Sequence, residues 1–243
     1  IAHNLRHDQL DNVITEAWLA EGAGTGAASA EIAALQPQLA SIFRLAKHLK
    51  AQREVVRGKP ETFNRPDYSF KLQGVTGSEP DGSETVLIGT RSRGAPLDLM
   101  VAEAMILANS TWGQWLAACG VPGIYRSQAS LAPGMKVRMG TRAQPHAGIG
   151  VKAYAWSTSP LRRYVDLVNQ WQIIACARHG NTAALVAPFK PKDTNLMAVI
   201  SAFDAAYTAY NGFQNGMERF WTLKHLQQAG ITGWVANAPV RLG

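Results

Sequence analysis

The stretch STSPLRRYVDLVNQW, residues 157–171, combines the pattern of a helix start with two adjacent arginines. Ser159 is a favourable N-cap, and Pro160 suits the first helical position. The apolar residues recur at steps of three and four, which is typical of an amphipathic helix. The pattern predicts a helix to about residue 178 with one apolar face, formed by Leu161, Tyr164, Val165, Val168 and Trp171.

This helix would carry Arg162 and Arg163 in its first turn, where free backbone N–H groups and the helix dipole are already positive. Each cation there costs roughly a few tenths of a kcal/mol unless an anion is bound. Helix N-termini bind phosphate, and arginine contacts phosphate through paired hydrogen bonds. The stretch therefore predicts an anion site. The alternative is an exposed helix start in which Arg162 pairs with Asp166.

The positive charge of the chain is concentrated in one segment. The 243 residues include 24 Lys and Arg against 17 Asp and Glu, a net charge of +7. Such a one-sided segment indicates a polyanionic partner, most simply nucleic acid, with a solvated basic loop as the alternative. No Asp or Glu occurs between Glu103 and Asp166, and the cations in this interval are Arg126, Lys136, Arg138, Arg142, Lys152, Arg162 and Arg163.

The cysteine content and the hydropathy of the chain limit the classes of protein to which it can belong. Cys119 and Cys176 are the only cysteines, and neither belongs to a CxxC or Cys/His motif that would suggest zinc. Both lie in apolar helical patterns, so we expect reduced core residues in an intracellular, cytoplasmic protein. No apolar run reaches the ~18 residues of a membrane span. Residue 1 is Ile and the last stretch has the pattern of a strand just starting, so we expect an internal piece of a longer protein.

The periodicity along the chain predicts one mixed α/β domain that is rich in helix. Strand-like runs at 69–75 and 85–91 flank a turn. The segment 96–119 is apolar almost all round, which favours a buried central helix ended by Gly120. The other expected helices are 8–20, a long helix over 30–57 that is bent at Pro37 and ended by Gly58, and one or two helices over 193–229.

The stretch AYAWSTSPLRRYVDLVNQW (153–171) resembles the signature of the ribonuclease II (RNB) exoribonucleases, roughly Y-x-x-x-T-S-P-[IL]-R-[RK]-[YF]-x-D-[LM]-x-x-[HN]. VAEAMILAN (101–109) is similar to the family's central helix, GIYRSQ (123–128) to a strand and loop, and FNRPDYSF (63–70) to the segment with a stacking aromatic. NLRHDQLD (4–11) and MERFWTLKHL (217–226) resemble flanking helices. The residues of these motifs are most similar to those of bacterial members of the family, in particular proteobacterial ones.

The resemblance implies a fold and an activity. Residues 1–232 would be the C-terminal part of an RNB catalytic domain, and residues 233–243 would begin an OB-fold domain or linker. The family's implied reaction is 3′→5′ hydrolysis of single-stranded RNA to nucleoside 5′-monophosphates. It uses Mg²⁺ held by clustered aspartates, and OB-fold domains flank the catalytic domain.

The resemblance also assigns roles to the residues around the two arginines. Arg162 would hold the scissile phosphate and stabilise the charge that develops on it, and Arg163 would contact a neighbouring phosphate. Asp166 would orient both. Phe63 matches the aromatic that stacks on a base near the RNA 3′ end, with a core phenylalanine as the alternative.

Further residues are expected to contact RNA. Tyr125, Arg126 and Tyr164 would bind RNA in its channel, although Arg126 has the alternative of a simple surface charge. Glu218 or Gln214, one turn apart on a late helix, would lie near the nucleotide, unless Glu218 forms a salt bridge with a nearby Lys or Arg.

One position departs from the family pattern. Gln170 stands where the family often has His, which puts one supporting hydrogen bond in doubt.

The metal-binding motif of the family, of the type D-x-x-x-x-x-D-x-D-D, is not found in this sequence. We therefore expect the Mg²⁺ ligands outside this chain. Three interpretations follow: part of an active exoribonuclease that works with its N-terminal half and OB-fold domains, a non-catalytic RNA-binding module, or a structural module that keeps the fold.

Overall fold

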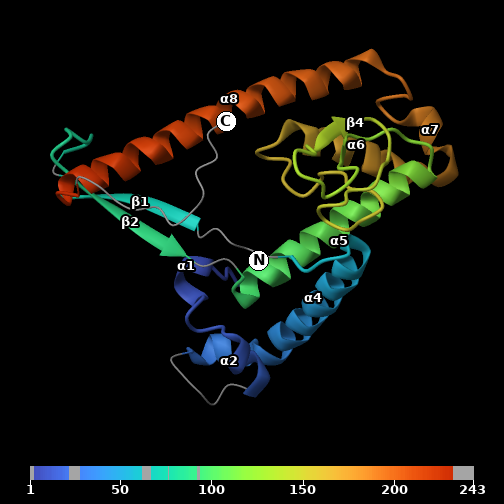
Figure 1. Cartoon of the computed structure of the whole chain (residues 1–243). Coiled ribbons are helices and arrows are strands. Elements are labelled where there is room, and N and C mark those ends of the chain that lie inside the picture. The colour runs from blue at the N-terminus through green and yellow to red at the C-terminus, as the bar shows by residue number, and fades with distance from the viewer. Residues whose placement is uncertain (1–2, 22–27, 62–66, 76, 92–93, 232–243) are drawn as a thin grey trace. The chain divides into compact units, whose positions relative to one another are not determined.

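The computed structural model describes residues 3–21, 28–61, 67–75, 77–91 and 94–231 (Figure 1). It confirms a mixed α/β fold that is rich in helix. The chain divides into two compact units, one made of residues 1–63 and 94–205 and the other of 64–93 and 206–243. Phe63 and the expected domain start at 233–243 lie outside the described residues.

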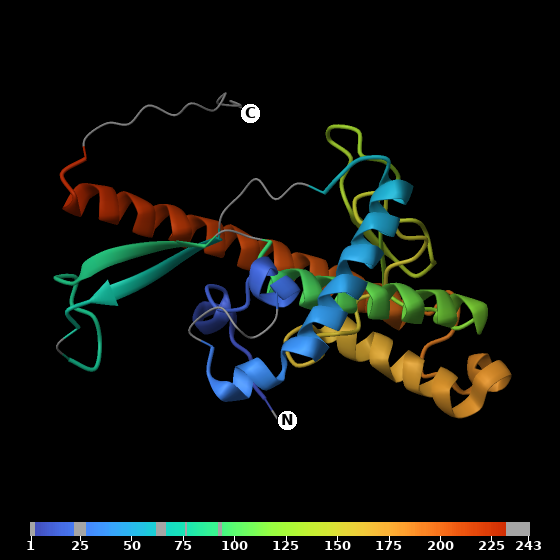
Figure 2. The ribbon, with the colours of Figure 1, turned by 90° about the horizontal axis from the view of Figure 1, so that it is seen from below.

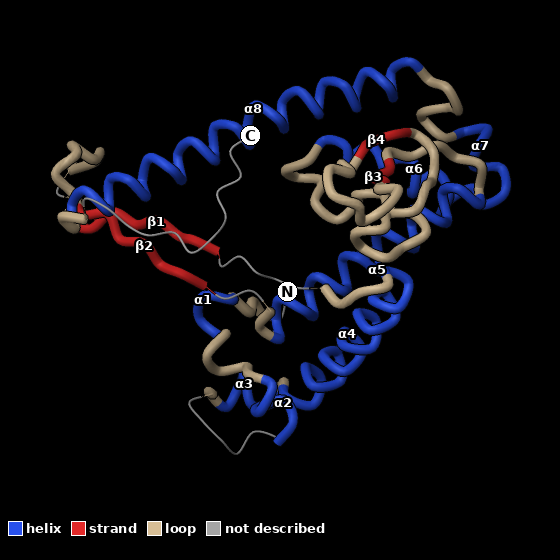
Figure 3. The backbone as a smooth tube through the Cα atoms, in the orientation of Figure 1, coloured by secondary structure: helices blue, strands red, loops and turns tan. Residues whose placement is uncertain are grey.

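The first unit holds most of the helices and one small sheet (Figure 3). Its strands β3 (Tyr125–Ser127) and β4 (Arg138–Gly140) pair antiparallel, with Tyr125 opposite Gly140. The helices, in chain order, are α1 (His7–Leu10), α2 (Glu16–Glu21), α3 (Ala30–Ala34), α4 (Gln36–Arg57), α5 (Pro96–Ala118), α6 (Tyr164–His179), the 3-10 turn Gly180–Thr182, α7 (Ala183–Val186) and the start of α8 (Thr194–Gln228).

The N-terminal helices are more broken than predicted. The expected helix over 8–20 is two short helices, α1 and α2. The expected helix over 30–57 is interrupted at Leu35, and Pro37 lies in the first turn of α4 instead of at a bend. Proline has no N–H and clashes with the preceding turn, so the first turn of a helix is where it fits. Gly58 ends α4 as predicted, in a left-handed conformation with φ 75°.

Helix α5 begins at Pro96 and ends before Gly120, as expected, but it is not buried all round. It packs against α4 and α6 (Figure 2). The prediction of a fully buried helix is therefore wrong for its outer face, because these two neighbours cover only part of the surface. Its exposed apolar side chains include Val101, Met105, Leu107 and Trp115.

The core of the first unit consists of three apolar clusters. One joins α2, α4 and α5 around Trp18 and Phe43, and the others surround Leu116 and Val168. Cys176 is buried and Cys119 packs against its cluster, and both thiols are free, as predicted. Burial, with the neighbouring Cys119, raises the pKa of Cys176 to about 12. None of the described helices has the length and apolar character that a membrane crossing requires.

The second unit is a hairpin with the C-terminal part of α8. Strands β1 (Asp67–Gln73) and β2 (Thr85–Arg91) pair antiparallel, which confirms the predicted strand–turn–strand pattern. His225 Nδ1 lies 2.7 Å from the carbonyl oxygen of Val86, and the Gln228 amide bonds the backbone of Glu84 and Val86. These bonds hold the helix end on β2. The segment 193–229 forms one helix rather than two.

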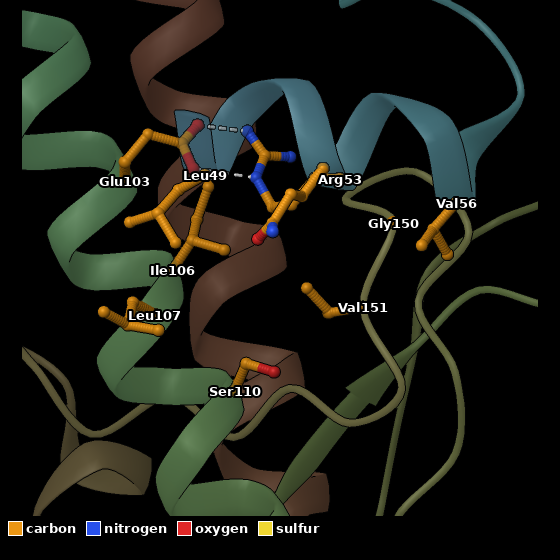
Figure 4. A pocket seen from close by; sticks show the side chains of 10 residues that line it. Leu49, Arg53, Val56, Glu103, Ile106, Leu107, Ser110, Gly150 and Val151 are labelled. Atoms are coloured by element: carbon orange, nitrogen blue, oxygen red, sulfur yellow. Dashed lines mark hydrogen bonds and ion pairs between the residues drawn. The ribbon is translucent and has the colours of Figure 1, made fainter. Parts of the chain in front are cut away.

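A buried ion pair joins α4 to α5 (Figure 4). The Arg53 guanidinium donates to both carboxylate oxygens of Glu103, to Glu61 at 3.0 Å and to the backbone carbonyl of Ile149 at 2.6 Å. The side chains of Arg53 and Glu103 are 8% and 2% exposed. Gly150 has φ +79°, and a Cβ there would lie 2.3 Å from the Arg53 carbonyl oxygen, so only glycine fits.

An adjoining cavity of about 200 Å³ lies between α4, α5 and the loop at Gly150 (Figure 4). Leu49, Ile106, Leu107 and Val151 line it, next to the ion pair. Arg53 also bonds Glu61 and the Ile149 carbonyl, whereas the bonds described for the Glu103 carboxylate are those to Arg53. Loss of the arginine would therefore leave Glu103 without its counter-ion next to a largely aliphatic cavity wall.

We predict that Arg53→Met lowers the free energy of unfolding by about 3–5 kcal/mol, because it leaves the Glu103 carboxylate buried without its partner. Urea denaturation measures the loss. Arg44→Met on the exposed side of the same helix is the matched control, since Arg44 bonds only the Ser41 hydroxyl among the contacts described. An equal loss in both variants would contradict the prediction.

Candidate nucleic-acid interface

The helix that carries the signature begins later than predicted. Helix α6 starts at Tyr164, and Arg163 is its N-cap in an extended conformation. The backbone N–H groups of Arg162 and Arg163 both donate to the Ser159 carbonyl, at 3.2 and 3.0 Å. The prediction of an N-cap at Ser159 is therefore wrong. Residues 159–163 form a tight turn that presents the two arginines before the helix.

A buried carboxylate explains this turn. Asp166 is fully buried, and its Oδ1 accepts from the backbone N–H of Ser159 at 2.9 Å and from Arg163 Nη2 at 2.7 Å. Arg162 is exposed, and its guanidinium lies 3.5 Å from the Ser159 hydroxyl. The carboxylate thus orients Arg163, and the predicted alternative of an Arg162–Asp166 pair is not what the structure shows.

The apolar face predicted for this helix is only partly correct. Val165 and Val168 are buried, but Leu161 is fully exposed and Tyr164 is half exposed. Because α6 begins after Arg163, Leu161 lies in the turn and takes no part in the helical face. Tyr164 instead packs edge-on against Trp171, with ring centroids 6.2 Å apart.

Two arginines stack on one indole ring. The guanidinium carbon of Arg126 lies 3.8 Å from the centroid of Trp156, and that of Arg163 lies 4.0 Å from it. Such cation–π contacts contribute about 0.5–2 kcal/mol each. The ring also meets Phe203 edge-on at 6.4 Å. Arg163 is also paired with Asp166, so this carboxylate offsets part of the repulsion between two cations that share one ring.

Buried amides on two helices hold the segments that carry this stack. Asn169 Oδ1 accepts from the Ile124 N–H at 2.7 Å, and its Nδ2 donates to the carbonyls of Ile124 and Trp156 at 2.9 and 2.7 Å. From α5, Asn109 Oδ1 accepts from the Ser157 N–H at 2.9 Å. These bonds fix the backbone on either side of Trp156 and next to Arg126.

Gln170 retains a hydrogen bond to the same region. Its Nε2 donates to the Ser157 carbonyl at 2.8 Å. The residue that departs from the family pattern therefore still ties α6 to the segment before the two arginines.

Tyr125 has a core position. Its side chain is 2% exposed, and its hydroxyl donates to the Gly113 carbonyl at 3.1 Å. Burial raises its pKa to about 12. Its hydroxyl contact joins β3 to α5, and the expected contact of Tyr125 with RNA stays a prediction.

The remaining predicted residues are Phe63, Gln214 and Glu218. Phe63 is outside the described residues, and Glu218 belongs to the second unit. The Glu218 carboxylate accepts from Gln214 Nε2 at 3.1 Å, so the two candidates for the nucleotide contact bond each other on an exposed face of α8.

A buried histidine lies close to the arginine stack. Burial, and after it the charge of Arg126, lowers the pKa of His146 to about 4. Its ring meets Tyr154 edge-on at 5.8 Å, and its Nδ1 lies 3.3 Å from the Ile149 N–H. His146 is therefore neutral at physiological pH and adds no positive charge to the cluster.

Sequence reasoning missed Trp156, Asn109, Asn169 and His146. An aromatic residue shortly before TSP, in a basic segment, is the one local signal that could have found Trp156.

The described residues do not fit the Mg²⁺ that the resemblance implies. Within the described ranges, no group of three or more His, Cys, Asp and Glu side chains could hold a metal ion. Asp166 already pairs with Arg163. The cluster can bind and orient an anion, and no step through a metal follows from it.

Comparison with known proteins identifies the class. The RNB domain family matches residues 3–135 and 134–179, so this chain belongs to the RNB domain family. An uncharacterised ribonuclease from Synechocystis is 32% identical over an alignment that covers 32% of this chain and 15% of that protein.

Solved structures share the fold. The Dss1 exoribonuclease of Candida glabrata, as an active-site mutant, gives a TM-score of 0.67 at 21% identity over 93% of this chain and 31% of that chain. RNase R of Mycoplasma genitalium with ribose-methylated single-stranded RNA gives a TM-score of 0.63 at 14% identity, over 92% of this chain and 40% of that chain. The same RNase R with double-stranded RNA gives a TM-score of 0.61 at 14% identity, over 91% of this chain and 45% of that chain. The chain thus spans less than half the length of these proteins.

We predict that Asn169→Ala lowers the free energy of unfolding by about 2–4 kcal/mol, because it leaves the backbone groups of Ile124 and Trp156 buried without their partners. Chemical denaturation measures this loss. The exposed Asn181→Ala is the control and should cost less than about 0.5 kcal/mol. A loss in Asn169→Ala no larger than that of the control would show that the amide is not needed.

We predict that His146 contributes to a loss of stability in acid. Since its pKa is lowered from 6.5 to about 4, the unfolded chain binds the proton more tightly. The contribution of His146 to the free energy of unfolding, about 3 kcal/mol, is complete above pH 6.5 and is lost as the pH falls towards 4. Urea denaturation between pH 4 and 7 should show a flatter pH dependence in His146→Asn. An unchanged profile, equal to that of the exposed His48→Asn, would contradict this.

Proposed function

We propose that this chain is part of a 3′→5′ hydrolytic exoribonuclease that degrades single-stranded RNA to nucleoside 5′-monophosphates. The observation that carries the proposal is the arginine cluster, in which Arg126 and Arg163 stack on Trp156 and Arg162 is exposed beside them. Membership of the RNB domain family supports the same class of reaction. RNA is the polyanion that this family membership favours.

Arg162 is the residue that we assign to the scissile phosphate. It is exposed, and the turn at Ser159 holds its backbone before α6. A cation at this position stabilises negative charge that develops on a phosphate oxygen. The paired donors of its guanidinium suit a phosphate group.

Arg163 and Asp166 act as a unit in this proposal. The buried carboxylate holds Arg163 through a 2.7 Å ion pair, so the guanidinium is oriented before RNA binds. Arg163 contacts the phosphate next to the scissile one. Asp166 touches no RNA itself and serves to position Arg163.

The other residues give contacts that tolerate any RNA sequence. Arg126 adds a further phosphate contact beside Trp156, and Tyr164, which is half exposed, contacts the strand near Arg163. Phe63 stacks on a base, and base stacking contributes about 1–3 kcal/mol without selecting the base. Glu218 or Gln214 contacts the nucleotide.

The metal chemistry belongs to the rest of the protein in this proposal. Mg²⁺ is held by aspartates outside this chain, and this chain supplies binding and orientation of RNA. Residues 1–232 are the C-terminal part of the catalytic domain of a cytoplasmic, bacterial enzyme, and residues 233–243 begin an OB-fold domain or linker. The similarity of the signature to bacterial members supports this assignment. RNase R, a structural neighbour, forms complexes with RNA, which supports RNA as the partner.

The test uses the natural protein that contains this chain, with Mg²⁺ and 5′-labelled oligoadenylate. We expect a ladder that shortens from the 3′ end, and we expect Arg162→Ala to lower kcat by about 10²–10³. Arg178→Ala, an exposed arginine at the end of α6, is the matched control and should keep full activity. An intact substrate, or equal rates for the two variants, would overturn the proposal.

Binding separates RNA recognition from a structural role. The slope of log affinity against log salt should fall by about one phosphate contact in Arg162→Ala, measured by fluorescence anisotropy with labelled oligoadenylate. Arg178→Ala should leave the slope unchanged. If both variants bind RNA like the parent protein, Arg162 does not contact RNA.

A further inference from the structure

A second cavity of the first unit lies beside the C-terminal end of α5. Its volume is about 640 Å³, within the range of roughly 300–1,000 Å³ that holds small organic ligands. Three segments line it: the end of α5 with the loop that follows, the β3–β4 hairpin, and the turn before α8. The cavity is therefore formed by separate parts of the chain and is larger than the one next to Arg53.

This cavity is distinct from the arginine cluster on Trp156. Neighbouring residues of an extended strand point to opposite faces. Tyr125 lines the cavity, and the next residue of β3, Arg126, stacks on Trp156. The hairpin thus separates the two regions, and a ligand in the cavity would not occupy the proposed RNA contacts.

The charged groups of the cavity are both cations. Arg142 lies two residues after β4, Lys192 lies in the turn before α8, and no carboxylate belongs to the lining. The nearest acid along the chain, Asp193, accepts from the Asn195 N–H at 2.8 Å and caps α8. The hydroxyl of Thr141 is a further polar group of the lining. These groups suit a phosphate, which accepts several charge-assisted hydrogen bonds.

The backbone at Lys192 is unusual. Among the described residues, it is the one non-glycine residue with positive φ, at 67°. Side chains other than glycine rarely adopt this left-handed conformation. The conformation places a cation at the cavity in a turn where glycine would be easier.

The remaining wall is apolar. Its exposed apolar side chains are Ala117 at the end of α5 and Met197 in the first turn of α8, whereas Val121, Pro122 and Tyr125 are buried. A mostly apolar wall with a few polar groups at one side is typical of sites that bind a flat organic group with a charged end. A nucleoside with one phosphate has this combination of a flat base and an anionic group.

We propose that this cavity binds a free nucleoside monophosphate. Its phosphate bonds Arg142, Lys192 and the Thr141 hydroxyl, and its base lies against Ala117 and Met197. This ligand has the chemistry of the product that the proposed reaction releases, but the binding site does not rest on that reaction. It is a separate site for a small nucleotide in the same unit.

The test is isothermal titration of adenosine 5′-monophosphate, at low salt, into the natural protein that contains this chain. We expect saturable binding, and a dissociation constant about tenfold or more higher in Arg142→Gln, because a charge-assisted contact is lost. Lys192→Gly, which suits the positive φ, should weaken binding in the same way. The matched control is Arg138→Gln, an exposed arginine of β4 outside the lining, which should bind within about twofold of the parent.

Ligand controls decide the chemistry. Adenosine should fail to bind, and inorganic phosphate should bind more weakly than the nucleotide. Equal affinity for inorganic phosphate and adenosine 5′-monophosphate would overturn the nucleoside assignment. No saturable binding, or the same loss in Arg138→Gln as in Arg142→Gln, would overturn the site.

Two further arms separate this site from the RNA contacts. Arg162→Ala should leave the affinity for the nucleotide unchanged. If Arg162→Ala instead lowers this affinity while Arg142→Gln keeps it, the nucleotide binds at the RNA contacts and the proposal is overturned. If oligoadenylate binds with the same dependence on Arg142 and displaces the nucleotide, the cavity serves RNA, and the free nucleotide is excluded. If the nucleotide does not bind the cavity, the ladder assay on the natural protein can still succeed. The cavity proposal and the exoribonuclease proposal can therefore be overturned independently.

Discussion

The carboxamide of Asn169 is the constraint on which the arginine cluster depends. It bonds both the N–H and the carbonyl of Ile124, as a neighbouring strand would, and it also bonds the carbonyl of Trp156. Strand β3 has only three residues, so the adjacent backbone groups have little sheet to pair with. Buried backbone groups need partners. A side chain of α6 supplies them, and the positions of Arg126 and Trp156 follow.

The fold could be predicted where local chemistry decides it. Gly58, Pro96 and Gly120 mark helix ends because each has a backbone preference that no packing needs to supply. The start of α6 could not be predicted in this way. Ser159 and Pro160 are a strong local signal, yet the buried Asp166 carboxylate bonds the Ser159 N–H and Arg163 and stabilises a turn instead. A contact over seven residues outweighed the local preference.

The residues of the candidate site also differ in whether local sequence could predict them. Arg162, Arg163 and Asp166 are adjacent in sequence, so their charges and spacing already indicated an anion site. Trp156 and Asn169 owe their roles to contacts with distant residues, such as Ile124, 45 positions before Asn169, and no periodicity reveals such contacts. The apolar character of α5 was also visible, but which of its faces stays exposed depends on where α4 and α6 pack.

Gly150 shows how the backbone of one helix can restrict mutation in a loop far along the chain. Its Cα lies so close to the backbone of Arg53 that any side chain would push the loop away from α4. The same loop supplies the Ile149 carbonyl that accepts from Arg53, whose acidic partner Glu103 lies 50 residues further along the chain. The tolerance of position 150 to substitution is therefore set by its left-handed backbone and by the backbone carbonyl of Arg53, not by the charges themselves. Replacement of the arginine and the glutamate together would leave this restriction in place, because a residue of any type at position 53 keeps that carbonyl.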